Sequence, residues 1–564
     1  MKKIFLIVIV ILTTIFGYSQ NSFYVSTTGN NSNNGSLSSP WLTIQYGCNQ
    51  LQAGDTLNIM AGVYQEKIDL DVSGTSTAYI TIQNYLNDNV IIDAINFNDA
   101  NAIIWTDNSY LRIKGLHLTN NIHNYASGLA LQDVAHHIEI LNNKISNIKF
   151  SSDPNAPITT NTNAVPLDIY ADNSVDSIHH ITIYGNEVFN NQTGYSENIA
   201  AGGNFTDFII ENNIVHDNTN IGIDIGGNYG ICPVSALDHG RNGIIRDNLV
   251  YNCDSPYSTA AGIYIDGGWD IVVENNICHH NGYGGEIGCE ENGTTENVIF
   301  KNNIFYHNKY AGMHIGGYDV NTTGIVLNSS VYNNTFYQND TGQNFNGELI
   351  LTKSENCNIQ NNIFYLSSQN VFIYFDRTQT NLSLMHNLVF ADAGSNNLEV
   401  TGALNISGLQ NFYDATGYGA NSIFGNPFFN DIVNNDFHIT SNSVAIDAGN
   451  PAYTVSNNET DIDGQYRIYN GIIDCGADEY HPVLSVNDVY KKNIIIYPNP
   501  TNGIVYIKNV LNFSYEIYSC TGQLVKSYSS CNTIDLTTLN KGLYLVKIYN
   551  INGLNISNIK VIKE

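Results

Sequence analysis

Carboxylate, phenol and imidazole side chains recur at one position of several short, glycine-rich strands in the middle of the chain. The strands are PLDIY (166–170), GIDIGG (222–227), GIYIDGG (262–268), GGEIGCE (284–290), GMHIGGYD (312–319) and NGELIL (346–351). When their aliphatic residues are aligned as the buried face, the alternate side chains point outward. The outward column is Asp168, Ala200, Asp224, Tyr264, Glu286, His314 and, at the end of the alignment, Glu348.

These residue types can transfer protons and can hold a hard cation. Carboxylates on neighbouring strands repel one another, and a repeat that uses Asn, Thr or Val elsewhere has no structural need for them here. We therefore interpret four members as catalytic candidates, with a solvated edge as the alternative: Asp224, Tyr264, Glu286 and His314. Candidates for substrate binding are Arg241, Asp266, Glu290, Tyr318, Asp319, Glu348 and Lys353. For the two bases among them, a structural salt bridge is the alternative.

The elements that must position this column belong to a sequence repeat. Nine segments, from HIEILNNKIS (137–146) to NLSLMHNLVF (381–390), share a short strand, a polar turn ending in Asn and a second short strand. The strands alternate, are rich in Val and Ile and have no helical stretch between them, which excludes βαβ units. Their spacing suits one rung of a parallel β-helix with loops of varying length. The fixed asparagines are Asn143, Asn186, Asn213, Asn248, Asn276, Asn303, Asn334, Asn362 and Asn387.

Two stacked columns follow from this register. One Asn per rung at the same turn predicts an internal ladder, in which each amide bonds to the tight bend and to the next Asn. The position three residues later predicts a stack of rings that includes Tyr251, His279 and Tyr306. His279 is therefore predicted to have a structural role in this stack. A zinc site formed by His279 and His280 is the weaker interpretation.

The repeat resembles that of the right-handed parallel β-helix proteins, whose best-known enzymes are pectate lyases and polygalacturonases. The resemblance covers roughly residues 22–480 and implies an all-β, single-stranded solenoid of about 12–13 rungs. Residues 20–68 resemble an N-terminal cap, in which WLTIQYGCNQL forms a short amphipathic helix over the open end. The β-helix itself is expected over residues 69–480.

This resemblance implies a polysaccharide substrate and leaves two reactions open. A lyase would use a calcium ion held by Asp224, Asp266 and Glu286 to neutralise a uronate carboxylate, and a base would then start β-elimination. Candidates for that base, or for the matching acid, are Tyr264, His314, Arg241 and Lys353. The strongly acidic chain suits an anionic glycan only with the calcium ion, and calcium-assisted lysis is the leading hypothesis.

An inverting glycoside hydrolase on the same face is the second hypothesis. Rungs are about 4.8 Å apart, so Asp224 and Glu286 would be separated by about 9–10 Å, at the upper edge of the inverting range. A non-catalytic, glycan-binding surface protein is the third hypothesis. The loop at 228–241 is long, and we expect it to wall a groove beside the column.

The end of the chain differs in composition. The segments IIIYPNPTNGIVYIK (494–508), YEIYSCTGQLVKSY (515–528) and IDLTTLNKGLYLVKIYN (534–550) alternate and are joined by glycine turns, which predicts a small β-sandwich. They are similar to the type IX secretion sorting domain of Bacteroidetes. The resemblance implies a linker at 481–493, a sorting domain at 494–564 and recognition by the type IX secretion machinery. A carbohydrate-binding sandwich is the alternative.

The N-terminus and the charge restrict the location and the partners. Lys2 and Lys3 precede the apolar run IFLIVIVILTTIF, which predicts a secretory signal peptide over residues 1–19. No other stretch is apolar enough to predict a transmembrane helix. The chain has 51 acidic and 22 basic residues and a formal charge of −29, which excludes nucleic acid and anionic membranes as partners. We expect an exported monomer, either extracellular or attached to the cell surface.

Overall fold

The computed structural model describes residues 20–317, 319, 321–456, 459–482, 495–497, 499–508, 513–519, 523–531, 533–549 and 555–563. The chain divides into two compact units, one that ends at Tyr480 and one that starts at His481. The predicted signal peptide, Tyr318 and most of the predicted linker lie outside the described residues. Within the described ranges, no helix is long and apolar enough to cross a membrane.

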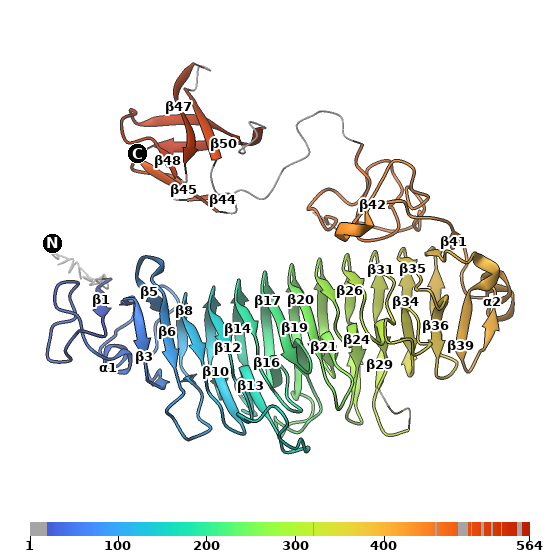
Figure 1. The fold of residues 1–564 in the computed structure, drawn as a ribbon, viewed down its shortest axis with the longest axis horizontal. Helices are drawn as coiled ribbons and strands as arrows, with labels where there is room; N and C mark the ends of the chain where they lie inside the picture. Colours follow the sequence, from blue (N-terminus) through green and yellow to red (C-terminus); the bar gives the residue numbers. More distant parts are fainter. Residues whose placement is uncertain are drawn as a thin grey trace, which may run out of the picture. The chain divides into compact units, whose positions relative to one another are not determined.

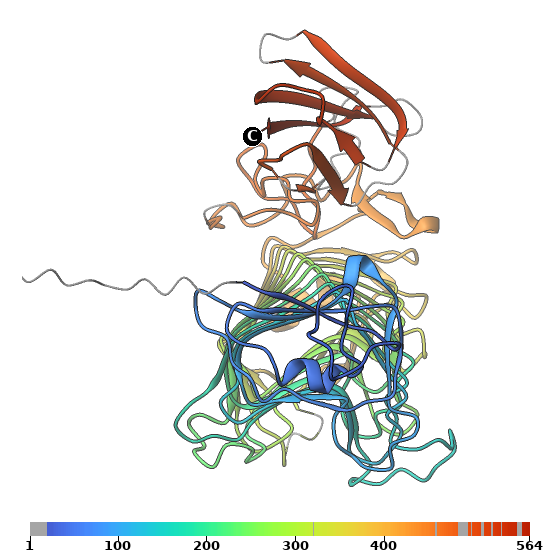
Figure 2. The same cartoon turned by 90° about the vertical axis from the view of Figure 1, so that its left-hand side faces the viewer.

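The first unit is a parallel β-helix whose successive rungs superimpose when the stack is viewed along its length (Figure 1, Figure 2). Its first face contains β4 (Ile68–Asp69), β7 (Ile104–Thr106), β10 (Ala126–Gln132), β13 (Ala164–Ala171), the start of β16 (Ile199–Glu211), β18 (Ile223–Gly226), β21 (Ala261–Asp266), β24 (Tyr283–Gly288), β28 (Ala311–Ile315), β32 (Leu349–Leu351), β36 (Val371–Phe375) and β39 (Glu399–Gly402).

The second face follows the first in each rung. It contains β1 (Ser22–Val25), β2 (Thr56–Ile59), β5 (Ile80–Asn84), β8 (Ser109–Lys114), β11 (His136–Leu141), β14 (Ile178–Tyr184), the end of β16, β19 (His239–Arg246), β22 (Trp269–Glu274), β26 (Ile299–Lys301), β30 (Ser330–Tyr332), β34 (Asn358–Gln360) and β37 (Ser383–Met385). Three short strands precede it in later rungs: β25 (Thr294–Glu296), β29 (Ile325–Leu327) and β33 (Ser354–Glu355).

The third face is a separate sheet of 13 strands in the described part of the chain, which agrees with the predicted number of rungs. It contains β3 (Gly62–Tyr64), β6 (Val90–Asp93), β9 (His117–Thr119), β12 (Lys144–Ser146), β15 (Glu187–Phe189), β17 (Ile214–Thr219), β20 (Leu249–Asp254), β23 (Ile277–His279), β27 (Ile304–Tyr306), β31 (Thr335–Tyr337), β35 (Ile363–Tyr365), β38 (Leu388–Phe390) and β41 (Ile423–Phe424).

The predicted asparagine ladder forms at the turn between the second and third faces. At Asn276, for example, the backbone N–H and Nδ2 donate to Oδ1 of Asn303 at 2.9 and 3.0 Å, and Nδ2 also reaches the Ile245 carbonyl at 2.9 Å. The ladder begins at the Leu116 N–H and ends at the Ser422 hydroxyl. Because each side-chain amide satisfies backbone groups of the preceding rung, the ladder fixes the register of all three faces.

The predicted ring stack is confirmed for five consecutive rungs of the third face. Centroids are 4.6–5.4 Å apart along Phe189, His216, Tyr251, His279 and Tyr306. Burial, with the nearby imidazoles of His280 and His307, lowers the pKa of His279 to about 4, so its ring is neutral. Beyond Tyr306, Phe437 of β43 (Asp436–Ile439) packs on the stack at 5.1 Å.

Helices cover both ends of the stack. At the N-terminal end, the predicted helix is α1 (Ile44–Cys48), and Glu66 accepts two of its free N–H groups at 3.0 Å. The stack begins at β1, one strand before the GDTLNIMAG segment expected to start it. At the other end, α2 (Leu409–Thr416) was not predicted from the sequence, and its Phe412 packs on Phe375 of the last rungs.

The second unit contains two antiparallel sheets, which agrees with the small all-β domain expected there. One sheet consists of β44 (Ile495–Tyr497), β45 (Ile504–Lys508) and β48 (Thr533–Asp535), and the other of β46 (Phe513–Ser519), β47 (Leu524–Cys531), β49 (Gly542–Tyr549) and β50 (Asn555–Lys563). Buried aliphatic and aromatic side chains from both sheets form its core, among them Val505, Tyr515 and Val546.

Candidate functional site

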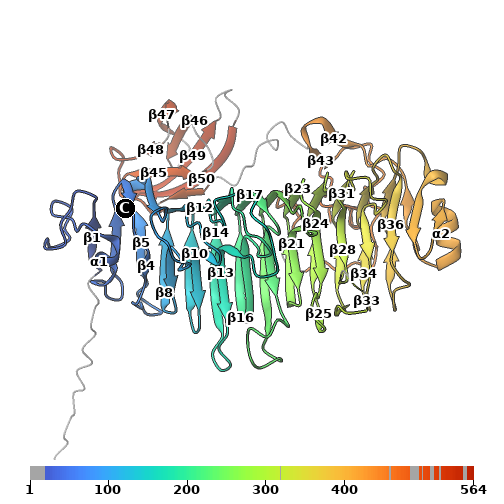
Figure 3. The same ribbon diagram turned by 60° about the horizontal axis from the view of Figure 1, so that its bottom comes forward.

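The outward column of the first face has the predicted register through six rungs. Asp168 pairs with Ala200, Ala200 with Asp224, Asp224 with Tyr264, Tyr264 with Glu286, and Glu286 with His314. Figure 3 shows the strands β13, β21, β24 and β28 that carry most of this column. The alternate residues, such as Ile263 and Ile265, fill the core, which directs the polar side chains outward.

A loop covers the centre of this column. Tyr264 is only 2% exposed and Glu286 6%, although both side chains point away from the core. The loop, residues 227–238, is attached to the column by a hydrogen bond from the Tyr229 hydroxyl to Asp266. Asp238 holds the loop together by accepting the N–H groups of Gly230 and Cys232 at 2.6 and 2.9 Å. The loop therefore lies over the column in this structure, whereas we had expected it to wall a groove.

Five carboxyl groups gather at the covered column. They are Glu197, Asp224, Asp266, Glu286 and Glu290. In the described ranges, no Lys or Arg forms an ion pair with any of the five. Glu197 was not predicted from the sequence, because it lies in a loop before β16 and outside the strand alignment.

Burial and mutual repulsion favour the protonated form of Asp224 and Asp266. Burial, and then the neighbouring carboxylates Glu197 and Asp266, raise the pKa of Asp224 well above its usual value. Burial also raises the pKa of Asp266 to about 7, although hydrogen bonds from Tyr229 and from the Glu290 N–H at 2.7 Å oppose the shift. Asp224 Oδ1 is buried and has no hydrogen-bond partner among the described residues. A carboxyl oxygen in this situation is suited to carry a proton or to receive a ligand.

The side chain of Glu286 contacts the imidazole of His314. Its Oε1 lies 2.7 Å from Nδ1 of His314, one rung further along. The other ring nitrogen, Nε2, lies 3.3 Å from the Thr352 hydroxyl, whose own hydrogen is donated to the Gly317 carbonyl at 2.9 Å. An ionised carboxylate only accepts, so Glu286 in that form takes the Nδ1 hydrogen of His314, and the Thr352 hydroxyl contacts the same ring at Nε2. Thr352 was not among the predicted residues.

The structure corrects the position of Glu348. The register partner of His314 is Ile350, so Glu348 does not belong to the outward column. Its side chain is fully buried and accepts the N–H and Nδ2 of Asn339 at 3.1 and 2.6 Å. It ends a second ladder, not recognised from the sequence, that includes Asn281, Asn308 and Asn339. The register prediction for Glu348 is therefore wrong, because the loop before β32 displaces the alignment by two residues.

The remaining predicted binding residues lie apart from the column. Arg241 binds Asn204 at 2.7 Å and the Leu237 and His239 carbonyls, which anchors the covering loop. Lys353 donates to the Thr323 carbonyl at 2.8 Å. Asp319 is partly exposed and caps its own turn by accepting the Asn321 N–H at 2.9 Å. Tyr318 lies outside the described residues.

The proposed calcium ligands have suitable chemistry, but their carboxylate oxygens do not all lie within 4.8 Å of one another. Oxygen donors match a hard cation, and the unpartnered Asp224 oxygen is a suitable donor. In the part of the chain that the structure describes, three or more ligand atoms lie within 4.8 Å of one another at two places, and neither includes Asp224, Asp266 or Glu286. Hydrogen bonds to Tyr229 and His314 occupy oxygens of two of the three carboxylates. The calcium site stays a prediction.

A cavity of about 550 Å³ lies on the same column, nearer the N-terminal end. Its lining includes Asp69, Trp105, Ala130 and Asp168, which occupy four successive column positions. The Trp105 indole donates to the Gln132 side chain at 3.0 Å, which fixes the ring in the cavity. Sequence analysis missed Trp105 because its rung precedes the nine repeats. Its size, together with an indole and several polar groups, is typical of a small-molecule or sugar-binding pocket.

Family comparisons agree with the two units. Residues 23–176 match the family described as Pel9A-like, right handed beta helix region, and residues 232–324 match the family described as right handed beta helix region. Residues 495–564 match the secretion system C-terminal sorting domain. The protein is thus a right-handed β-helix protein with a secretion sorting domain, which makes it a secreted or cell-surface protein.

The chain belongs to the same family of right-handed β-helix proteins as the Uncharacterized protein YwoF of Bacillus subtilis (strain 168). The two are 30% identical over 449 residues, which cover 76% of this chain and 92% of that protein. Solved structures with a similar fold include pectate lyase Pel9A, at 18% identity over 82% of this chain and 98% of that chain, with a TM-score of 0.38. Another is the GH136 lacto-N-biosidase from Eubacterium ramulus, at 14% identity over 66% of this chain and 64% of that chain, with a TM-score of 0.39.

Proposed function

We propose that this protein is a secreted enzyme that cleaves a polysaccharide along the first face of the β-helix. The sorting domain supports a location outside the cell, where polymeric glycans are found. The covered column supplies paired carboxyl groups of unequal environment, and the Trp105 cavity supplies an aromatic surface on the same line. Function thus rests on the geometry of this face and not on the fold alone.

The geometry best supports glycoside hydrolysis with inversion. The observation that carries this proposal is the contrast between Asp224, which is buried with an unpartnered oxygen, and Glu286, which His314 holds as an acceptor. Environments that push two carboxyl groups toward different protonation states assign an acid and a base. Asp224 would therefore be the general acid, and Glu286 would be the general base.

In this mechanism Asp224 gives its proton to the glycosidic oxygen as the bond from that oxygen to the anomeric carbon breaks. A water molecule attacks the anomeric carbon from the opposite side and gives a proton to Glu286. The two residues are two rungs apart, or about 10 Å between backbones, which leaves room for the sugar and the water. Tyr264 lies between them, and burial raises its pKa, so its hydroxyl stays protonated and can donate a hydrogen bond.

The charges at the site favour an uncharged glycan. The five carboxyl groups have no Lys or Arg ion pair within the described residues, and the whole chain carries a formal charge of −29. A polyuronate would be repelled unless a cation intervened. The Trp105 cavity lies four rungs, or about 19 Å, from Asp224, which is long enough for an oligosaccharide to reach both. The small side chains of Ala130 and Ala200 alternate with Asp168 along this path.

Calcium-assisted β-elimination is the second candidate. It is favoured by the unpartnered Asp224 oxygen among five carboxyl groups, which is a suitable donor for a hard cation. Asp224, Asp266 and Glu286 would hold the ion, which would neutralise a uronate carboxylate. The described geometry gives no free base beside these residues, because His314 is committed to Glu286 and Thr352.

One assay separates these functions. The exported chain is incubated with a panel of neutral glycans and polyuronates, with calcium or with EDTA, and both new reducing ends and the ultraviolet absorbance of unsaturated uronate are measured. Reducing ends from a neutral glycan, unaffected by EDTA and without that absorbance, are the expected result. Absorbance that requires calcium would replace the hydrolase with the lyase. Glycan binding with neither signal would overturn both and indicate a non-catalytic binding protein.

A further inference from the structure

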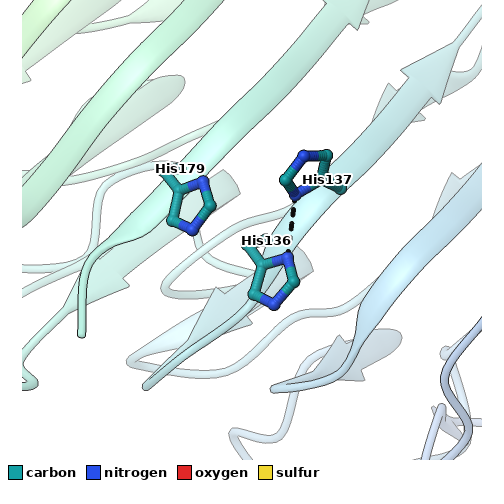
Figure 4. Close-up of side chains that lie close together, drawn as sticks. All are labelled: His136, His137 and His179. Carbon is teal, nitrogen blue, oxygen red and sulfur yellow. Dashed lines mark hydrogen bonds between the residues drawn. The ribbon is translucent and has the colours of Figure 1, made fainter. Parts of the chain in front are cut away.

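Four histidines meet at one corner of the β-helix, away from the column described above. His136 and His137 begin β11, and His179 and His180 occupy the matching positions of β14. Figure 4 shows the first three of these side chains. His136 stacks on His179 with centroids 4.9 Å apart, and His137 stacks on His180 at 4.4 Å. The corner lies at the start of the second face, in β11 and β14.

Ring nitrogens face one another in this cluster. Nδ1 of His136 lies 2.9 Å from Nδ1 of His137, as the dashed line in Figure 4 shows. Ligand atoms of His136, His137 and His179 all lie within 4.8 Å of one another. With metal–nitrogen bonds of about 2.0–2.1 Å, two nitrogens of a tetrahedral zinc site are about 3.3 Å apart, so the first pair is already close to that spacing.

The fold does not require histidine at this corner. His137 and His180 have φ values of +53° and +55°, a left-handed conformation that the corresponding residues of the later rungs share. In those rungs the residue is always Asn or Asp: Asp207, Asn242, Asp270, Asn297, Asn328, Asn356 and Asn381. Asn and Asp adopt this conformation readily and suffice for the turn. Two adjacent rungs that both carry a His-His pair therefore point to a role beyond the turn.

A cavity lies beside the cluster. Its volume is about 540 Å³, and it is lined by His136 and His179 and also by Asp107 and Asp176. Asp176 lies close enough to influence both His136 and His179, so it or a water molecule could complete the coordination.

We propose that His136, His137 and His179 form a binding site for a divalent transition-metal ion, with Zn²⁺ as the representative ion. Three imidazoles match the preference of zinc, nickel and copper ions for nitrogen ligands, and they do not match that of calcium or magnesium. An ion bound here would link two neighbouring rungs and stabilise the folded β-helix. This proposal is independent of the reaction proposed for the first face.

Another histidine pair in the same protein provides a matched control. His279 and His280 show the same Nδ1 to Nδ1 contact, at 2.8 Å, and His280 has the same left-handed backbone, with φ +56°. This pair does not belong to either group of three close ligand atoms found in the described residues. We therefore expect a metal ion to bind at the corner, where a third histidine lies nearby, and not at His279 and His280.

The test is isothermal titration calorimetry of the purified exported chain with Zn²⁺. We expect the unaltered chain to bind one ion, H137N to bind it at least tenfold more weakly, and H280N to bind like the unaltered chain. H137N carries the residue of the later rungs, so it should fold, and H179T carries the residue found at the next rung, Thr206. Circular dichroism checks both folds.

Two results would overturn the proposal. The first is that the unaltered chain binds no Zn²⁺. The second is that H137N and H179T bind as tightly as the unaltered chain, or lose no more affinity than H280N, since either would assign the ion to other residues. As an independent readout, Zn²⁺ should raise the melting temperature of the unaltered chain and of H280N but not that of H137N.

Discussion

Nδ1 of His314 lies 2.7 Å from Oε1 of Glu286, across neighbouring rungs of the first face. Both side chains are buried, so the bond is shielded from water. The hydroxyl of Thr352 contacts the far side of the ring, at Nε2, which holds the imidazole in one orientation. Because the Glu286 carboxylate is held in one orientation, it can accept a proton from a water molecule at a fixed position, as a general base must.

Replacing Glu286 with Gln should remove the base while keeping its shape. We expect kcat to fall by about 10²–10⁴-fold, which is the usual contribution of general base catalysis. The melting temperature should change by no more than a few degrees. Steady-state kinetics on the glycan identified by the assay above measure the loss. The matched control is E355Q, at a partly exposed carboxylate of β33 outside the column, which should keep full activity. Full activity in E286Q would remove Glu286 from the mechanism.

Much of this column could be predicted from the sequence because the asparagine ladder repeats at a fixed place in every rung. Once Asn248, Asn276 and Asn303 are aligned, the strands between them are aligned as well, and Tyr264 and Glu286 must be neighbours. The same periodicity predicted the stack of rings that contains His279. Local repetition thus specified both the fold and the face that carries the polar column.

Contacts that do not repeat could not be predicted in this way. The Tyr229 to Asp266 bond that holds the covering loop joins residues 37 positions apart and occurs in a single rung. Glu348 was misaligned because the loop before β32 changes length, and a shift of two residues preserves the alternation. Trp105 lies in a rung without the repeat motif, so nothing in the alignment pointed to its cavity.

Trp105 should control binding of long substrates. In W105A, we expect KM for a long oligosaccharide to rise by about tenfold, because the loss of an aromatic contact costs about 0.5–1.5 kcal/mol beyond its buried area. The kcat value and the kinetics of short substrates should not change, since Trp105 lies four rungs from Asp224. W105F keeps a ring and should lose less. Equal effects on short and long substrates would place Trp105 outside the binding surface.

The Tyr229 hydroxyl should keep the loop of residues 227–238 closed over the column. In Y229F, the hydrogen bond to Asp266 is lost, and a bond to a carboxylate contributes about 1.5–3 kcal/mol. We expect amide hydrogen exchange across the loop to become at least tenfold faster, while exchange in β21 and β24 stays slow. Y195F, at a partly exposed tyrosine outside this loop, is the control. Unchanged exchange in Y229F would show that other contacts hold the loop.

The buried carboxyl group of Glu348 should make the β-helix less stable as the pH rises. Burial raises its pKa from 4.5 to about 8 despite the hydrogen bonds from Asn339. The folded state therefore keeps a proton that the unfolded state has already lost, so the stabilisation is complete below about pH 4.5 and disappears as the pH rises to about 8. The effect is of the order of a few kcal/mol for a fully buried group.

The variant E348Q isolates this effect, because Gln can accept both Asn339 hydrogen bonds through one amide oxygen, as the asparagines of the ladder do. We expect its melting temperature to fall less between pH 5 and pH 8 than that of the unaltered chain, with the largest difference at pH 8. Calorimetry across this range measures both slopes. E399Q, at a partly exposed carboxylate of β39, should keep the original slope. If E348Q showed the same pH dependence of the melting temperature as the unaltered chain, the proton held by the folded state would belong to other carboxyl groups. Asp266 would be the next to test, since its pKa is raised to about 7.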